Sequence, residues 1–161
     1  MPLETWFDQL GGLTPIEGNL HRSPIPVTRE HFRVLREADI RVVFSMEEAV
    51  PGPLAIQAGL DWRPHFWTDD QPPTPRQMDA FLADFMRVPD EQRVVVHCKA
   101  GWGRAGTAIT CALVAKHGWS AEKALTHYWS RVPPARGVMT SNGQAEFVRG
   151  YAASLNGRGL F

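Results

Sequence analysis

The sequence lacks the features that mark disulfide-rich, membrane-spanning or strongly charged proteins. Its 161 residues include only two cysteines, Cys98 and Cys111, so no disulfide framework is expected. Lysine plus arginine equals aspartate plus glutamate, at 17 each, so no overall field attracts nucleic acid or a membrane surface. No apolar run approaches the length of a membrane span, and residues 1–7 lack the apolar core of a signal peptide. The six histidines show no metal-ligand spacing, so we expect neither a metal nor another cofactor.

What the sequence does contain is typical of one globular domain over residues 1–161. Hydrophobic residues make up 43% of the chain, enough for a core without cross-links. Apolar runs of strand length alternate with helical patterns, which predicts an α/β fold with a short, largely parallel sheet flanked by helices. The predicted strands are a hairpin over 13–23 and the runs 42–46, 61–67 and 93–96, and the predicted helices begin near Thr28, Pro53, Thr74, Thr107, Ser120 and Ser141.

Two of these helix starts are predicted from capping patterns. Thr74 and Gln77 form a capping box with Pro75 at the first helical position, followed by apolar residues at helical spacing. Ser141 and Gln144 show the same spacing after the Pro-Pro break at 133–134. We interpret that pair as the start of the last helix.

The stretch 97–107 carries the strongest functional signal. It reads HCKAGWGRAGT, after a β-branched run and before a helical one, so it forms a tight loop between a strand and a helix. The backbone N–H groups of such a loop, together with the positive end of the helix, suit a phosphate dianion and favour Cys98 as a thiolate. Arg104 can bind two phosphate oxygens with its planar guanidinium. The alternative is that Cys98 is a small buried hydrophobic residue.

This stretch resembles the signature loop of the protein tyrosine phosphatase superfamily, and most closely that of the compact dual-specificity phosphatases and the mitotic-exit branch. The resemblance implies the fold of that superfamily and a two-step reaction through a cysteinyl phosphate. It also implies phosphate binding by Lys99, Ala100, Gly101, Trp102, Gly103 and Arg104. One position differs, because the family has Ser or Thr after the arginine and this chain has Ala105. That hydroxyl helps the cysteine to leave, so turnover is expected to be slower, and Thr107 is the nearest possible substitute.

A general acid is also required, because an ester leaving group otherwise departs as an unprotonated oxyanion. The polar, proline-rich stretch 67–73 reads as a loop before the capped helix. It resembles the Trp-Pro-Asp acid loop of the family, with Thr68 in place of the proline, which makes Asp69 the acid and Asp70 the second choice. The alternative is that both are solvated loop carboxylates.

Other polar residues of the stretch have weaker interpretations. His97 is predicted to hydrogen-bond the backbone around the loop rather than to catalyse proton transfer. Lys99 either faces the substrate or is an ordinary solvated lysine, and Trp102 either lines the pocket or packs against the protein. Gln144 matches, by resemblance, a glutamine near the active site in some family members. On the residues alone, it is only a capping residue.

The sequence therefore predicts a cytoplasmic phosphomonoester hydrolase, since a working cysteine needs a reducing compartment. Its substrate is a phosphorylated protein or a small phosphomonoester, and no nucleic-acid partner is expected. Two alternatives remain open: a phosphate-binding pseudophosphatase, which Ala105 supports, and a sulfurtransferase of the rhodanese type. The acid loop counts against the second.

Overall fold

The computed structural model describes residues 2–158, which form two compact units. Residues 2–67 and 89–101 contain every strand of the described chain, and we call them the sheet unit. Residues 68–88 and 102–158 are helical, and we call them the helical unit. The two units are described separately.

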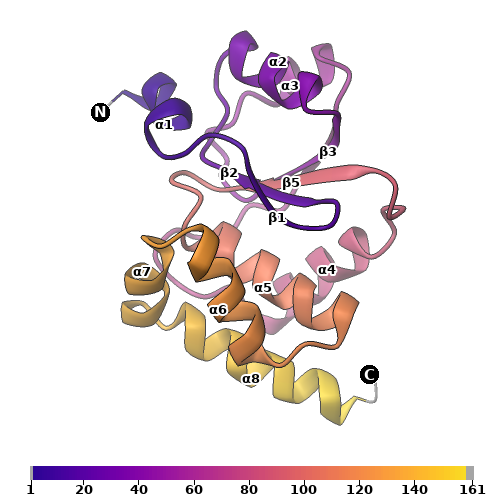
Figure 1. Ribbon diagram of the computed structural model, residues 1–161, viewed down its shortest axis with the longest axis vertical. Coiled ribbons are helices and arrows are strands. Elements are labelled where there is room, and N and C mark those ends of the chain that lie inside the picture. Colours follow the sequence, from indigo (N-terminus) through magenta and orange to yellow (C-terminus); the bar gives the residue numbers. More distant parts are fainter. Residues whose placement is uncertain (1, 159–161) are drawn as a thin grey trace. The chain divides into compact units, whose positions relative to one another are not determined.

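A five-stranded sheet, mostly parallel, forms the centre of the sheet unit (Figure 1). Its strands are β1 (Thr14–Glu17), β2 (Leu20–Ser23), β3 (Ile40–Ser45), β4 (Asp61–Pro64) and β5 (Arg93–His97), in the order β1-β2-β5-β3-β4. Only the β1–β2 hairpin is antiparallel. Ser23 and Ser45 both pair with His97, so β2, β3 and β5 end at the same edge. The predicted α/β class with a largely parallel sheet is confirmed.

Three helices belong to the sheet unit: α1 (Leu3–Gln9), α2 (Arg29–Glu37) and α3 (Gly52–Gln57). Helix α2 starts next to Thr28 as predicted, with Thr28 as its N-cap, and His31 completes a capping box. Helices α2 and α3 lie side by side against the sheet (Figure 1). Phe32 and Leu35 of α2 join Val43 and Val95 of the sheet in one buried apolar cluster. Burial of this face is what holds the helices on the sheet.

The helical unit consists of α4 (Pro75–Phe85), α5 (Arg104–His117), α6 (Ala121–Arg131), α7 (Ala135–Ser141) and α8 (Gln144–Gly157). Helix α5 contacts the other four (Figure 1). Gly106 permits this close approach, since a Cβ there would lie 2.7 Å from the Met139 sulfur and 2.8 Å from the Tyr128 ring. Within residues 2–158, no helix combines the length and the apolar character needed to cross a membrane.

Most predicted elements are confirmed, and the capping box of Thr74 and Gln77 is present as expected. The predicted start of the last helix is wrong. Ser141 is the final residue of α7, and α8 begins at Gln144. Gly143, between the two helices, has a left-handed φ of +86°. The strand predicted over 61–67 stops at Pro64, although the N–H groups of His65 and Trp67 still donate to the Ser45 and Met46 carbonyls. Helices α1 and α7 were not predicted.

Candidate active site

The stretch 97–107 forms the predicted strand, loop and helix. Val94–Val96 of β5 are buried, His97 ends that strand, and Arg104 begins α5. Cys98 is a free thiol with 3% of its surface exposed. Residues 98–101 of the loop belong to the sheet unit, and residues 102 and 103 belong to the helical unit.

His97 connects two strand ends to the backbone of Cys98. Its ring is fully buried, with Nδ1 2.9 Å from the Cys98 carbonyl and Nε2 2.6 Å from Ser45 Oγ. A carbonyl oxygen can only accept, so Nδ1 donates to it, while Nε2 shares a hydrogen bond with the Ser45 hydroxyl. Trp62 Nε1 donates to the same hydroxyl at 2.9 Å. The chain of bonds fixes the first peptide of the loop, in agreement with a positioning role for His97.

The next residues of the loop are held from the outside by the segment after β2. The Ile25 N–H donates to the Lys99 carbonyl at 2.9 Å. The Lys99 ammonium lies 5.7 Å from the centre of the Trp6 ring in α1, which is a cation–π arrangement. Gly101 has a φ of +82°, a left-handed conformation that favours glycine. The Lys99 ammonium thus has a partner within the protein, a placement that neither interpretation of this residue included.

The second half of the loop is packed against α8. A Cβ on Gly103 would lie 2.7 Å from Gln144 Oε1, so a side chain there would force the Gln144 amide to move. Gln144 is fully buried, and its Nε2 donates to the Gln71 carbonyl at 3.3 Å. Within the described residues, Oε1 of Gln144 has no hydrogen-bond partner. The structure thus brings Gln144 to the signature loop and to the acid loop, instead of using it as a cap.

Asp69 and Arg104 are brought together in the helical unit. Asp69 Oδ1 lies 3.3 Å from Arg104 Nη2, and the Arg104 side chain is 2% exposed while that of Asp69 is 56% exposed. Asp70 donates its N–H to Asp69 Oδ1 at 2.9 Å and has a φ of +58° with its side chain exposed. The arrangement favours Asp69 over Asp70 as the acid. Trp102, also in this unit, is half-buried.

The first turn of α5 contains Ala105, where the family has a hydroxyl, and Thr107, the nearest possible substitute. Ala105 is fully buried. The Thr107 hydroxyl donates to the Gly103 carbonyl at 2.7 Å, so this donor is already used within the helix. Further along α5, Cys111 is a buried core residue, and burial raises the pKa of its thiol, which keeps it protonated.

Sequence reasoning missed three residues that contact the loop or its supports. Ser45 and Trp62 orient His97, as described above. Arg22 on β2 is 1% exposed and donates to the Ala100 carbonyl at 2.8 Å and to the Gly101 carbonyl at 3.2 Å. The one available signal was a charged residue inside a short strand, where long charged side chains are rarely buried.

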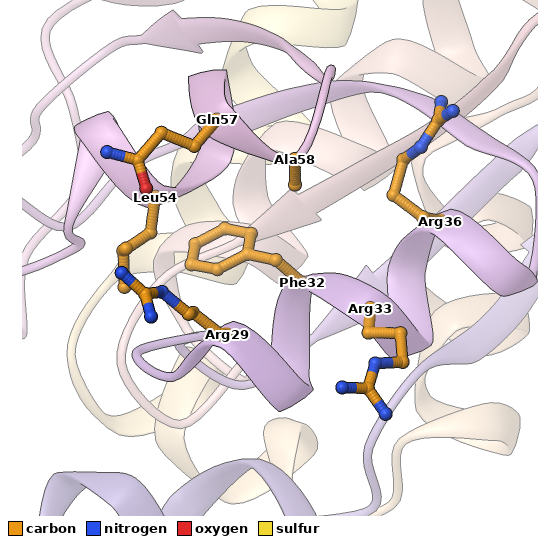
Figure 2. Close-up of a pocket in the computed structure, with 7 residues that line it drawn as sticks. All are labelled: Arg29, Phe32, Arg33, Arg36, Leu54, Gln57 and Ala58. Atoms are coloured by element: carbon orange, nitrogen blue, oxygen red, sulfur yellow. The ribbon is translucent and has the colours of Figure 1, made fainter.

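A separate pocket of about 390 Å³ lies between α2 and α3 (Figure 2). Phe32 lies at its centre, and Arg29, Arg33 and Arg36 surround it. The three guanidinium groups point in different directions, so they do not converge on one phosphate group (Figure 2). None of the predicted site residues lines this pocket.

The sequence comparisons identify phosphatase relatives. A family model described as "PTP-SAK: Swiss Army Knife protein, DSP-PTPase phosphatase domain" matches residues 16–154. The tyrosine-protein phosphatase cdc-14 of Caenorhabditis elegans is 36% identical over 78 residues, which is 47% of this chain and 10% of that protein. The human dual specificity protein phosphatase CDC14C is 34% identical over 77 residues, covering 47% of this chain and 16% of that protein. The match thus spans a small part of these longer relatives.

Solved structures share the fold of this chain. The crystal structure of Tk-PTP in the active form has a TM-score of 0.72 and 24% identity, covering 85% of this chain and 95% of that one. The structure of PTPMT1 in complex with PI(5)P has a TM-score of 0.73 and 19% identity, covering 91% and 98%. The comparisons do not favour the sulfurtransferase or the pseudophosphatase. The chain is a compact, dual-specificity-phosphatase-like member of the protein tyrosine phosphatase superfamily and belongs to the DSP-PTPase phosphatase domain family.

Proposed function

We propose that this chain is a cysteine-dependent phosphomonoester hydrolase of the protein-tyrosine/dual-specificity type, with residues 1–161 as one catalytic domain. The observation that carries the proposal is an ion pair between the two loops. Asp69 Oδ1 on the acid loop lies 3.3 Å from Nη2 of Arg104, which follows Cys98 in the signature loop. A general acid must reach the leaving oxygen of a bound ester, and Asp69 lies beside the arginine that binds the phosphate. The family match over residues 16–154 supports the same reaction class.

The reaction has two steps. The Cys98 thiolate attacks phosphorus, while Arg104 and the N–H groups of residues 99–103 bind the three equatorial oxygens. Asp69 protonates the leaving oxygen, and the phosphoryl group is transferred to sulfur. Water then attacks the cysteinyl phosphate with Asp69 as the base, which releases phosphate and restores the thiolate. Before substrate binds, the Asp69 carboxylate pairs with Arg104. When the phosphate replaces it there, Asp69 takes up a proton from water and donates that proton to the leaving oxygen.

Several residues support these groups. His97 fixes the peptide after the strand, Gln144 packs against Gly103, and Thr107 ties α5 to the loop. Gln144 Oε1 is an acceptor available to the attacking water in the second step. The proposed substrate is a phosphorylated protein or a small phosphomonoester, and the thiolate chemistry supports a location in the reducing cytoplasm.

The test is to assay the purified chain with p-nitrophenyl phosphate, phosphotyrosine and phosphoserine peptides, and thiosulfate with cyanide. We expect phosphate release and no thiocyanate. Arg104→Lys should lower kcat/KM by about 100-fold or more, because a point charge cannot hold two oxygens. Arg136→Lys, at an exposed position of α7, is the matched control and should match the wild type. Thiocyanate formation, or full phosphatase activity in Arg104→Lys, would overturn the proposal.

A further inference from the structure

Arg22 is a buried arginine at the end of β2, the strand that pairs with β5. Only 1% of its surface is exposed. Its guanidinium makes five hydrogen bonds, to the carbonyls of Leu10 (3.0 Å), Gly12 (3.2 Å), Ala100 (2.8 Å) and Gly101 (3.2 Å) and to Thr14 Oγ1 (3.3 Å). One side chain therefore joins the segment after α1 to the first half of the signature loop.

The charge of Arg22 has no acidic partner in the part of the chain that the structure describes. All five acceptors are neutral oxygens. Burying a cation without a counter-charge lowers stability, and a neutral side chain of similar size would avoid this cost. An anion bound at the neighbouring loop would supply the missing counter-charge. The Cys98 thiolate and a phosphate dianion are both such anions.

The hydrogen bonds also determine which way the loop peptides face. The carbonyl of Cys98 accepts from His97, that of Lys99 from the Ile25 N–H, and those of Ala100 and Gly101 from Arg22. Among residues 2–158 no peptide bond is cis, and in a planar trans peptide the next N–H points opposite to the carbonyl. Because these carbonyls are held by protein groups, the N–H groups that follow point away from those groups. Successive N–H groups on one side form an anion-binding concavity.

Gly101 and Arg22 fit each other sterically. A Cβ on Gly101 would lie 2.5 Å from Arg22 Nη2 and 2.7 Å from the Ser23 carbonyl. Its φ of +82° is strained for any residue with a side chain. The guanidinium therefore occupies the space that a side chain at position 101 would need, so Arg22 is built into the loop.

We propose that Arg22 is a positioning residue for the phosphatase reaction, an inference that rests on the proposed function. Its planar guanidinium turns the Ala100 and Gly101 carbonyls outward, so that the loop N–H groups can bind the phosphate. Its charge stabilises the anions on the inner side. Arg22 acts through the loop and does not touch the substrate.

The test compares Arg22→Lys, Arg22→Met and a control, Arg93→Met. Arg93 also donates to a backbone carbonyl, that of Ala38 at 3.0 Å, but from the opposite end of β5. The measurements are thermal unfolding, kcat and KM for p-nitrophenyl phosphate, calorimetric binding of inorganic phosphate, and the pH midpoint for alkylation of Cys98 by iodoacetamide.

Arg22→Lys keeps the charge but loses the two-carbonyl geometry. We expect it to weaken phosphate binding and kcat/KM by about tenfold, the effect of roughly one charged hydrogen bond, with the alkylation midpoint unchanged. Arg22→Met should lose more activity and move the midpoint to higher pH, because the charge is gone. The control should match the wild type in all four measurements.

Folded Arg22→Lys with wild-type phosphate affinity and kcat/KM would overturn the inference. If Arg22→Met does not fold, the comparison of Arg22→Lys with the wild type tests the inference by itself. A wild-type chain that binds phosphate without hydrolysing any ester would instead refute the proposed function. The phosphate-binding and alkylation measurements would still test Arg22.

Discussion

Replacing Asp69 by asparagine tests the assignment of the general acid. Asparagine has nearly the same shape, so it preserves packing while removing the proton donor. We expect alkyl phosphates, which have poor leaving groups, to be hydrolysed 10²- to 10⁴-fold more slowly, the typical contribution of a general acid, or about 3–5 kcal/mol. Aryl phosphates with good leaving groups should lose much less, because their oxygen needs little protonation.

The structure excludes a stability explanation for such a loss. The Asp69 side chain is 56% exposed, and its pair with Arg104 is the main contact that the substitution removes. Arg104 is buried, but the solvated Asp69 carboxylate is screened by water, so losing the pair should change the free energy of unfolding by about 1 kcal/mol or less. That is several-fold less than the expected change in activation free energy. The melting temperature should therefore change little while hydrolysis of alkyl phosphates is severely reduced.

The assay is a series of phosphate esters with graded leaving groups, measured across pH for the wild type, Asp69→Asn and Asp70→Asn. Asp70 is the matched control, an adjacent and exposed carboxylate. Asp69→Asn should steepen the dependence of the rate on the leaving group and remove the falling alkaline limb of the pH–rate profile. If Asp70→Asn shows this pattern and Asp69→Asn does not, the acid is the neighbouring residue and the reasoning from the Arg104 contact is wrong.

Ala105→Ser should speed breakdown of the cysteinyl phosphate by roughly ten- to a hundredfold, since a charge-assisted hydrogen bond is worth about 1.5–3 kcal/mol. Rapid quench should show a burst in the wild type and a smaller one in the variant; no burst and no gain would mean that another group already assists the leaving thiolate. Burial lowers the pKa of His31 below the ordinary 6.5, and its ring nitrogen accepts from the N–H groups of Val27 and Thr28, so folding favours the neutral ring. Stability from this group is present above pH 6.5 and is lost as pH falls below it, so His31→Gln should flatten the acid side of a melting-temperature profile. His21, whose pKa burial also lowers, leaves a residual slope, and an unchanged profile in His31→Gln would contradict the assignment.

Sequence patterns predicted helix starts correctly where hydrogen bonds between neighbouring residues determine them. The capping box of Thr74 and Gln77 sets a helix start through hydrogen bonds within four residues, and it is present. The same spacing at Ser141 and Gln144 failed because α7 already includes Ser141, and the left-handed Gly143 separates the two helices. The adjacent prolines at 133–134 predict a break, although proline also occurs at helix starts, and Pro134 is the N-cap residue of α7, which begins at Ala135.

The site residues also differ in how well the sequence predicts them. Cys98 and Arg104 were predictable because the loop chemistry is contained in seven consecutive residues. The resemblance to the Trp-Pro-Asp loop ranked Asp69 ahead of Asp70, and the contact with Arg104 supports the same order. Arg22 was not predictable, since its role depends on loop carbonyls 78 and 79 residues away in the sequence.

The central claim is that Cys98 carries the phosphoryl group during turnover. The most direct measurement is acid quenching of the wild type and of Cys98→Ser during hydrolysis of p-nitrophenyl phosphate, followed by mass spectrometry of peptides. We predict one added phosphoryl group on the wild-type peptide that contains Cys98, and no hydrolysis or labelling in Cys98→Ser. A phosphoryl group on another residue, or hydrolysis that persists in Cys98→Ser, would contradict the account.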